Sequence, residues 1–173
     1  MGCGAFFACK GGVNVLTEVD LRHLRRCVEL AEEALEAGDE PFGSVLVGAD
    51  GTVLAEDRNR IAATGDPTQH PEFALARWAA TNMSADERAA ATVYTSGEHC
   101  PMCAAAHGWV GIGRIVYASS SEQLTAWRRE LGAPAPPVQP LPVQEIVPGV
   151  VVEGPAPELA EQVRDLHRRL HHK

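Results

Sequence analysis

Two short motifs, His70-Pro71-Glu72 and Cys100-Pro101-Met102-Cys103, constrain this chain more than any other feature of its sequence. Each motif contains a proline, which is favoured in the first turn of a helix, and an alanine-rich stretch follows each one. The sequence therefore predicts two helices whose first turns carry an imidazole and two thiols. These side chains can bind one metal ion only if the two helices lie side by side on one face of a sheet.

The remaining elements indicate what that sheet is. Apolar residues recur at intervals of three and four over residues 20–37, which predicts an amphipathic helix capped by Asp20 and ended by Gly38. Two apolar runs, 44–47 and 52–55, flank an Asp-Gly turn and predict a β-hairpin. Further strands are expected at 91–95, 114–118, 144–147 and 150–153, further helices at 72–80, 100–110, 121–131 and 157–170, and a proline-rich connector at 132–142. Strands that alternate with helices in a short chain predict an α/β fold, a three-layer α/β/α sandwich.

Length and composition are those of one compact domain. The chain has 173 residues, of which 45% are hydrophobic and 22% charged. Residues 1–17 show no helical or strand period, so we expect a loose N-terminal extension followed by a single domain over residues 18–173. The N-terminus lacks the basic start and apolar stretch of a signal peptide, and no apolar run approaches the length of a membrane helix. We therefore expect a cytoplasmic protein with no membrane partner.

The charge balance indicates which kind of partner to expect. The formal net charge is −8, whereas a protein that binds a long nucleic acid usually needs a basic stripe to replace phosphate counterions. The main basic cluster is at the C-terminus, and we interpret it as a solvated helix end favoured by the helix dipole: Arg164, His167, Arg168, Arg169, His171, His172 and Lys173. The balance argues against a nucleic-acid partner and favours a small molecule.

The cysteines point to a metal site and not to disulfides. Five cysteines at irregular spacing make a poor disulfide framework, and Cys27 lies in an apolar helical stripe, where a buried free thiol is expected. Cys100 and Cys103 are spaced so that both sulfurs lie on one side of a first helical turn, where the helix dipole stabilises thiolates. With His70 they supply three zinc ligands and leave a fourth position open for water, which is typical of a catalytic zinc site.

Glu72 completes this constellation. It lies two residues after His70, and three ligands are already available without it. A carboxylate beside an activated water can take its proton and pass it to a ring nitrogen and a departing amine, which suits hydrolysis of an amidine carbon. His99 and His107 are alternative sources of a fourth ligand. The residues alone therefore leave open a zinc-stabilised binding protein without turnover.

The two motifs, together with Pro41-Phe42-Gly43, Asn59 and Asp66-Pro67-Thr68, resemble the cytidine deaminase-like superfamily of zinc deaminases. The resemblance covers residues 20–118 and is closest to the branch of guanine deaminases, tRNA adenosine deaminases and bacterial nucleoside deaminases. It implies a central five-stranded mixed sheet with a helix before the last strand, a Zn²⁺ cofactor and, usually, a homodimer. The chain departs from the usual family pattern by having Pro71 in place of alanine and His99 in place of proline.

The resemblance also implies an activity and its residues. We expect hydrolytic deamination of a free nucleobase or nucleoside of guanine, cytosine or modified, triazine type, with a tRNA adenosine deaminase as the alternative. The acidic, aromatic C-terminal segment of guanine deaminases is not found here. Glu72 is the expected catalytic shuttle, with His70, Cys100 and Cys103 as the metal ligands. The residues expected at the substrate are Asn59, as a hydrogen-bonding amide, and Phe42, Glu98, His99 and Asp66. Trp78 and Trp109 are interpreted as core residues.

Overall fold

A computed structural model describes residues 16–172. The predicted N-terminal extension lies outside the described residues, apart from its last two, which lead directly into the first helix. The helices are α1 (Glu18–Glu36), α2 (Ile61–Thr64), α3 (Pro71–Asn82), α4 (Ala85–Ala90), α5 (Pro101–Val110), α6 (Ser121–Glu130), α7 (Val143–Ile146) and α8 (Pro157–His171). The strands are β1 (Gly43–Val47), β2 (Val53–Arg58), β3 (Thr92–Gly97), β4 (Arg114–Ser119) and β5 (Val151–Glu153).

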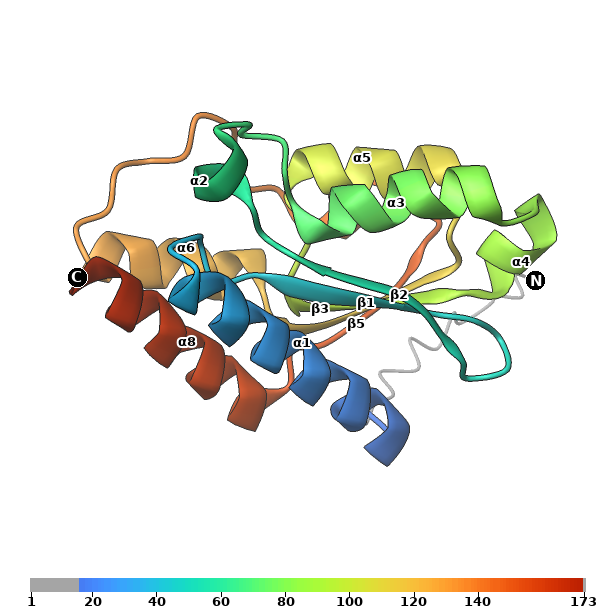
Figure 1. Cartoon of the computed structure of the whole chain (residues 1–173), viewed down its shortest axis with the longest axis horizontal. Helices are drawn as coiled ribbons and strands as arrows, with labels where there is room; N and C mark the ends of the chain where they lie inside the picture. Colours follow the sequence, from blue (N-terminus) through green and yellow to red (C-terminus); the bar gives the residue numbers. More distant parts are fainter. Residues whose placement is uncertain (1–15, 173) are drawn as a thin grey trace, which may run out of the picture.

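The strands form one five-stranded mixed sheet in the order β2-β1-β3-β4-β5. Strand β1 pairs antiparallel with β2 and with β3, whereas β3, β4 and β5 are parallel. Helices α3 and α5 cover one face of the sheet, and α1 and α8 cover the other, with α6 packed against α8 (Figure 1). The predicted three-layer α/β/α sandwich with a five-stranded mixed sheet is therefore confirmed, and so is the hairpin.

One edge of this sheet, which we call the carboxyl edge, brings together the ends of several strands. The parallel strands β3 and β4 end there, and β1, which runs the opposite way, begins there. Gly43 is required at this start of β1, because a Cβ atom would overlap both the Leu30 side chain and the Cys27 carbonyl of α1. Cys27 itself is a fully buried free thiol, as predicted. Helix α1 thus holds the start of β1 in place beside the end of β3.

Helix α1 begins earlier than predicted. The cap is Thr17 and not Asp20, because the Thr17 hydroxyl accepts a hydrogen bond from the Asp20 amide at 3.2 Å. The Asp20 carboxylate in turn accepts from the Thr17 amide at 2.9 Å, which completes a capping box. Asp20 also accepts hydrogen bonds from Tyr94 and Arg114 across the helix–sheet interface. The prediction was wrong because Thr17 had been assigned to the loose extension.

Other differences have local causes. The strand predicted at 144–147 is wrong, since this region forms the single turn of α7 before β5 begins. Helices α2 and α4 were not predicted, although α4 carries a capping box between Ser84 and Glu87. Trp109 was expected in the core but is 92% exposed on α5, whereas Trp78 is partly buried against the cluster under α3. Among the described residues, no helix is both long and apolar enough to cross a bilayer.

Candidate metal centre and active site

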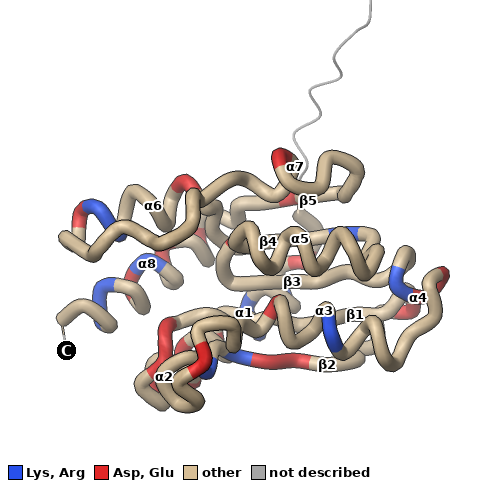
Figure 2. The backbone as a smooth tube through the Cα atoms, turned by 90° about the horizontal axis from the view of Figure 1, so that it is seen from above, with Lys and Arg blue, Asp and Glu red and all other residues tan. Residues whose placement is uncertain are grey.

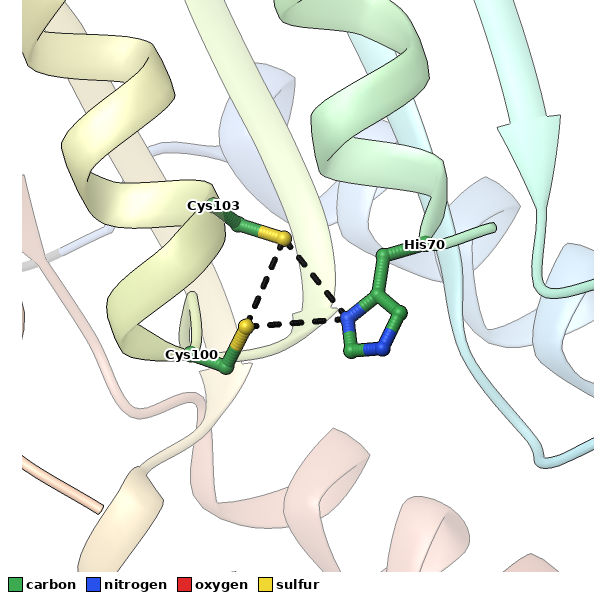
Figure 3. Close-up of side chains that lie close together, drawn as sticks. All are labelled: His70, Cys100 and Cys103. Carbon is green, nitrogen blue, oxygen red and sulfur yellow. Dashed lines mark hydrogen bonds between the residues drawn. The ribbon is translucent and has the colours of Figure 1, made fainter. Parts of the chain in front are cut away.

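The three predicted metal ligands lie at the starts of α3 and α5. His70 and Cys100 are the residues immediately before these helices, with extended backbone, and Cys103 is in the first turn of α5. The prolines of both motifs occupy the first turns, as expected. Helices α3 and α5 pack side by side, and Figure 3 shows the three side chains pointing toward one common position. The two helices therefore lie side by side, as the binding of one metal ion by both motifs requires.

The distances among the ligand atoms fit zinc. His70 Nδ1 lies 3.6 Å from each sulfur, and the two sulfurs lie 3.5 Å apart. Tetrahedral zinc with ordinary bond lengths places two sulfur ligands about 3.8 Å apart and sulfur and nitrogen about 3.6 Å apart. Within residues 16–172, these three side chains form the one group of three or more potential ligands. His70, Cys100 and Cys103 are therefore positioned to bind a zinc ion through three protein ligands.

The two thiols are prepared for metal binding. Their mutual hydrogen bond lowers the pKa of Cys100 to about 4, and the His70 imidazole acts in the same direction. The same hydrogen bond, together with burial and the nearby Glu72 carboxyl, raises the pKa of Cys103. One sulfur is thus already a thiolate at neutral pH, and the proton shared by the pair leaves when a metal ion binds.

Glu72 lies in the first turn of α3, beside the metal ligands. Its side chain is 5% exposed, and its Oε2 atom is 3.7 Å from the Cys103 sulfur. Burial raises the pKa of this carboxyl, while the neighbouring His70 acts in the opposite direction. A carboxyl group with a raised pKa can hold a proton near neutral pH, as a general acid and base must.

Asn59 follows β2 and is completely buried. Its Oδ1 atom accepts a hydrogen bond from the Ile61 amide at 3.0 Å, but within residues 16–172 no group accepts from its Nδ2 atom. A buried donor without a partner is costly, and a bound substrate that offers an acceptor would remove that cost. This geometry is compatible with the predicted substrate contact of Asn59, which stays a prediction.

Phe42 lies at the start of β1 and is half-buried. Its ring packs over Gly97, where an added Cβ would come within 3.0 Å of the ring. The ring also meets His167 of α8 in an edge-on arrangement, at 5.2 Å between centroids. Phe42 is thus anchored between the end of β3 and the C-terminal helix. Its use as a stacking surface for a flat base stays a prediction.

Glu98 and Asp66 both hold loops around the site. The Glu98 oxygens accept hydrogen bonds from the amides of Ser121 at 2.8 Å and Val143 at 2.9 Å, and so fix the starts of α6 and α7. Asp66 accepts from the Thr68 amide and hydroxyl, and closes the turn that leads into His70. Their carboxylates are engaged by protein donors, which makes loop positioning their visible role.

His99 directly precedes a metal ligand but faces elsewhere. It is fully buried, and its ring packs edge-on against His107 at 5.3 Å between centroids. Neither residue belongs to the ligand group, so neither supplies the fourth ligand that a closed structural site would need. Burial lowers the pKa values of both imidazoles, which favours their neutral forms.

Two buried hydrogen bonds beside Glu72 were missed by sequence reasoning. The hydroxyl of Thr95 lies 2.9 Å from Glu72 Oε1, and the hydroxyl of Ser44 lies 2.9 Å from that of Thr95. Both hydroxyl residues are completely buried. The available signal was that both residues carry hydroxyl groups and lie in strands of a sheet that helices are expected to cover on both faces. A hydroxyl group buried in this way needs a hydrogen-bond partner.

Comparison with known proteins places this geometry in a family. The family described as the cytidine and deoxycytidylate deaminase zinc-binding region matches residues 17–119. A probable cytosine deaminase of Schizosaccharomyces pombe is 34% identical over 118 residues, which are 68% of this chain and 70% of that protein. A tRNA-specific adenosine deaminase of Haemophilus influenzae is 34% identical over 107 residues, and the match spans only 62% of either chain.

The fold comparison extends further along the chain. The structure of a guanine deaminase from Nitrosomonas europaea superposes with a TM-score of 0.66 over 94% of this chain and 90% of that one. The two sequences are 20% identical, so this likeness shows a shared fold.

The fold and the metal centre define a zinc-binding member of the α/β deaminases. The chain belongs to the family of the cytidine and deoxycytidylate deaminase zinc-binding region, and its cofactor is zinc, which His70, Cys100 and Cys103 are positioned to bind. As a deaminase of this family it is a hydrolytic enzyme.

Proposed function

We propose that this enzyme removes an exocyclic amino group from a free nucleobase or nucleoside of guanine, cytosine or modified, triazine type, and releases ammonia. The observation that carries the proposal is the position of Glu72, buried beside three ligand atoms arranged for zinc. Such a site combines a metal position, a proton-accepting group and a buried free amide donor, which together suit attack of water on an amidine carbon.

Each residue has a distinct task in this proposal. Zinc, when bound, supplies Lewis-acid activation of a water molecule at neutral pH. Glu72 takes one proton of the attacking water and passes it to the ring nitrogen. It then takes the proton of the hydroxyl group added to the carbon and passes it to the amine, which leaves as ammonia. Asn59 donates its free Nδ2 hydrogens to an acceptor on the base or sugar, which holds the reacting carbon in place.

The charge distribution favours a small substrate. The chain carries a net charge of −8, and acidic residues gather around α2, near the start of α3 (Figure 2). The cations of α8 are partly neutralised within the protein, since Arg164 pairs with Glu130 at 2.8 Å and Arg169 with Glu32 at 2.7 Å. Because the Haemophilus influenzae relative acts on tRNA by its name, tRNA adenosine is the second candidate.

Ammonia release from a panel of substrates tests the proposal. The panel contains cytosine, guanine, adenine, their nucleosides and triazine analogues, with an anticodon stem-loop RNA as a separate substrate. We expect turnover of one group of small substrates, and Glu72→Gln should retain zinc while kcat falls by about 10²- to 10⁴-fold. Turnover of the RNA alone, with salt-sensitive binding, would replace the small-substrate proposal. Full activity of Glu72→Gln would remove Glu72 from the mechanism.

We further propose that the enzyme is a homodimer in the reducing environment of the cytoplasm. The exposed Trp109 on the outer layer of α3 and α5 supports a partner there, because tryptophan is enriched at protein–protein interfaces. Cys27, Cys100 and Cys103 are free thiols in this structure, and two of them must stay reduced to bind zinc. The single domain over residues 18–173 is likewise part of this proposal.

A further inference from the structure

Two buried hydroxyl groups on neighbouring strands form a hydrogen-bonded chain that ends at the carboxyl group of Glu72. Ser44 of β1 and Thr95 of β3 lie directly opposite one another in the antiparallel pairing. The Ser44 hydroxyl donates to the Thr95 oxygen at 2.9 Å, and the Thr95 hydroxyl donates to Glu72 Oε1 at 2.9 Å. Ser44 and Thr95 are fully buried, and Glu72 is 5% exposed.

The Thr95 hydroxyl has one proton and two possible acceptors. Glu72 Oε1 and the Gly97 carbonyl oxygen both lie 2.9 Å away. Both distances are ordinary for a hydroxyl donor, and a hydrogen bond received from Ser44 strengthens what Thr95 donates. The Thr95 hydroxyl is therefore within donating distance of Glu72 as well as of Gly97. Because Gly97 alone would satisfy this hydroxyl, burial by itself does not explain the contact.

The two oxygens of Glu72 consequently face different surroundings. Oε1 is held by Thr95, while Oε2 lies 3.7 Å from the sulfur of Cys103, on the side of the metal ligands. The terminal torsion of a glutamate is broad, so an untethered carboxylate would rotate freely between orientations. Proton transfer to and from a small substrate is sensitive to displacements of about 1 Å.

We propose that Ser44 and Thr95 are positioning residues that tether Oε1 of Glu72, so that Oε2 alone faces the metal ligands and is left free for proton transfer. The catalytic consequence rests on the proposed function, but the tether itself is a property of the protein without substrate. The two can therefore fail independently.

Infrared spectroscopy of the zinc-loaded protein, labelled with ¹³C-glutamate, tests the tether without a substrate. The carboxyl band of Glu72 is identified by its absence from Glu72→Gln. We expect this band to shift in Thr95→Val, which keeps the side-chain shape but removes the hydroxyl, and to return in Thr95→Ser. The matched control is Ser119→Ala, which removes a buried hydroxyl that donates only to the Ser96 carbonyl and should leave the band in place. An unchanged band in Thr95→Val would overturn the tether.

Kinetics with the substrate found in the panel test the consequence. Thr95→Val should lower kcat by about 10- to 100-fold with KM nearly constant, since the interaction orients the reacting group. Ser44→Ala should lower kcat by less, and Thr95→Ser should restore it. In the Glu72→Gln background the Thr95→Val substitution should cost nothing further. An effect on KM alone, or an additive loss in that background, would overturn the positioning role.

A second substitution covers the case in which Thr95→Val does not fold. Thr95→Cys has similar volume and a weak S–H donor, and it should shift the Glu72 band in the same direction by a smaller amount. An unshifted band in a folded Thr95→Cys protein that binds zinc would count against the tether. If no substrate in the panel is turned over, the proposed function fails, and the infrared result still decides whether the tether exists.

Discussion

The side chains of the metal centre depend on the backbone positions that carry them. His70 and Cys100 precede helices, so their backbones are extended and their side chains lie beyond the helix starts, while Cys103 and Glu72 project from first turns. Amide groups at a helix start are free of internal partners and carry a partial positive charge. A thiolate or carboxylate is stabilised at this position, and a metal ion can then join the two helix starts.

The loss of one thiolate should therefore have two effects at once. We expect Cys103→Ala to bind less than a tenth of the zinc of the unchanged protein and to lose the zinc-dependent part of its unfolding free energy. Metal analysis, with urea unfolding in the presence and absence of a chelator, measures both effects. Cys27→Ala is the control, because this buried thiol is not a ligand and its removal should cost stability without loss of zinc. A Cys103→Ala protein that keeps one zinc per chain would contradict the ligand assignment.

At the scale of elements, α8 packs across the sheet and buries a titratable group near the carboxyl edge. His167 is 2% exposed and lies between Phe42 and Trp127. Burial lowers its pKa to about 3, and the positive charges of Arg128 and His171 act in the same direction. This helix is therefore docked through a histidine that must stay neutral.

The docking of α8 should weaken in acid. The unfolded chain binds a proton at His167 below about pH 6.5, whereas the folded chain does so only near pH 3. More protons are thus bound in the unfolded state between these values, and stability falls as pH falls, by at most about 1.4 kcal/mol per pH unit. His167→Leu removes this contribution. Between pH 7 and pH 5, urea unfolding should show a loss about 2 kcal/mol larger for the unchanged protein than for the variant, and parallel losses would contradict the assignment.

The elements that could be predicted are those whose signals are local. The apolar spacing of α1 and the prolines in the first turns of α3 and α5 are patterns of a few neighbouring residues. The predicted metal ligands follow from these helix starts. The contact between Thr95 and Glu72 could not be predicted, because it depends on the register of β1 against β3 and on how α3 packs above them. Residues 144–147 were assigned wrongly because a short apolar run fits a strand or a helical turn equally well. The hydrogen bond from Val143 to Glu98, distant in sequence, fixes the start of that turn.

At the scale of the whole molecule, the layer of α3 and α5 holds the metal ligands and also presents an exposed aromatic side chain. In the opposite layer α8 packs on α1 and on the sheet, and the valine Val19 of α1 is 47% exposed. Trp109, by contrast, is 92% exposed on α5. The outer surface of the metal-binding layer is therefore the surface at which we expect a second copy.

The dimer proposal gives a direct prediction of mass. Sedimentation velocity at micromolar concentration should show a dimer for the unchanged protein and mainly monomer for Trp109→Glu, which places a charge in the proposed contact. Trp109→Phe should remain dimeric, since it keeps most of the apolar area. Zinc content should be the same in all three proteins, because Trp109 lies outside the ligand group. A monomer for the unchanged protein would contradict the proposed contact.

One carboxylate also marks the ends of a segment that can be lengthened at little cost. The Glu98 carboxylate accepts from the Ser121 amide at the start of α6 and from the Val143 amide at the start of α7, so it fixes both ends of the stretch made of α6 and the connector that follows it. Its second half, residues 132–142, is mostly exposed and has no regular structure. Lengthening such a closed, solvent-facing loop costs little free energy. We therefore expect insertions into residues 132–142 to leave α6, the contacts of Glu98 and the metal ligands unchanged.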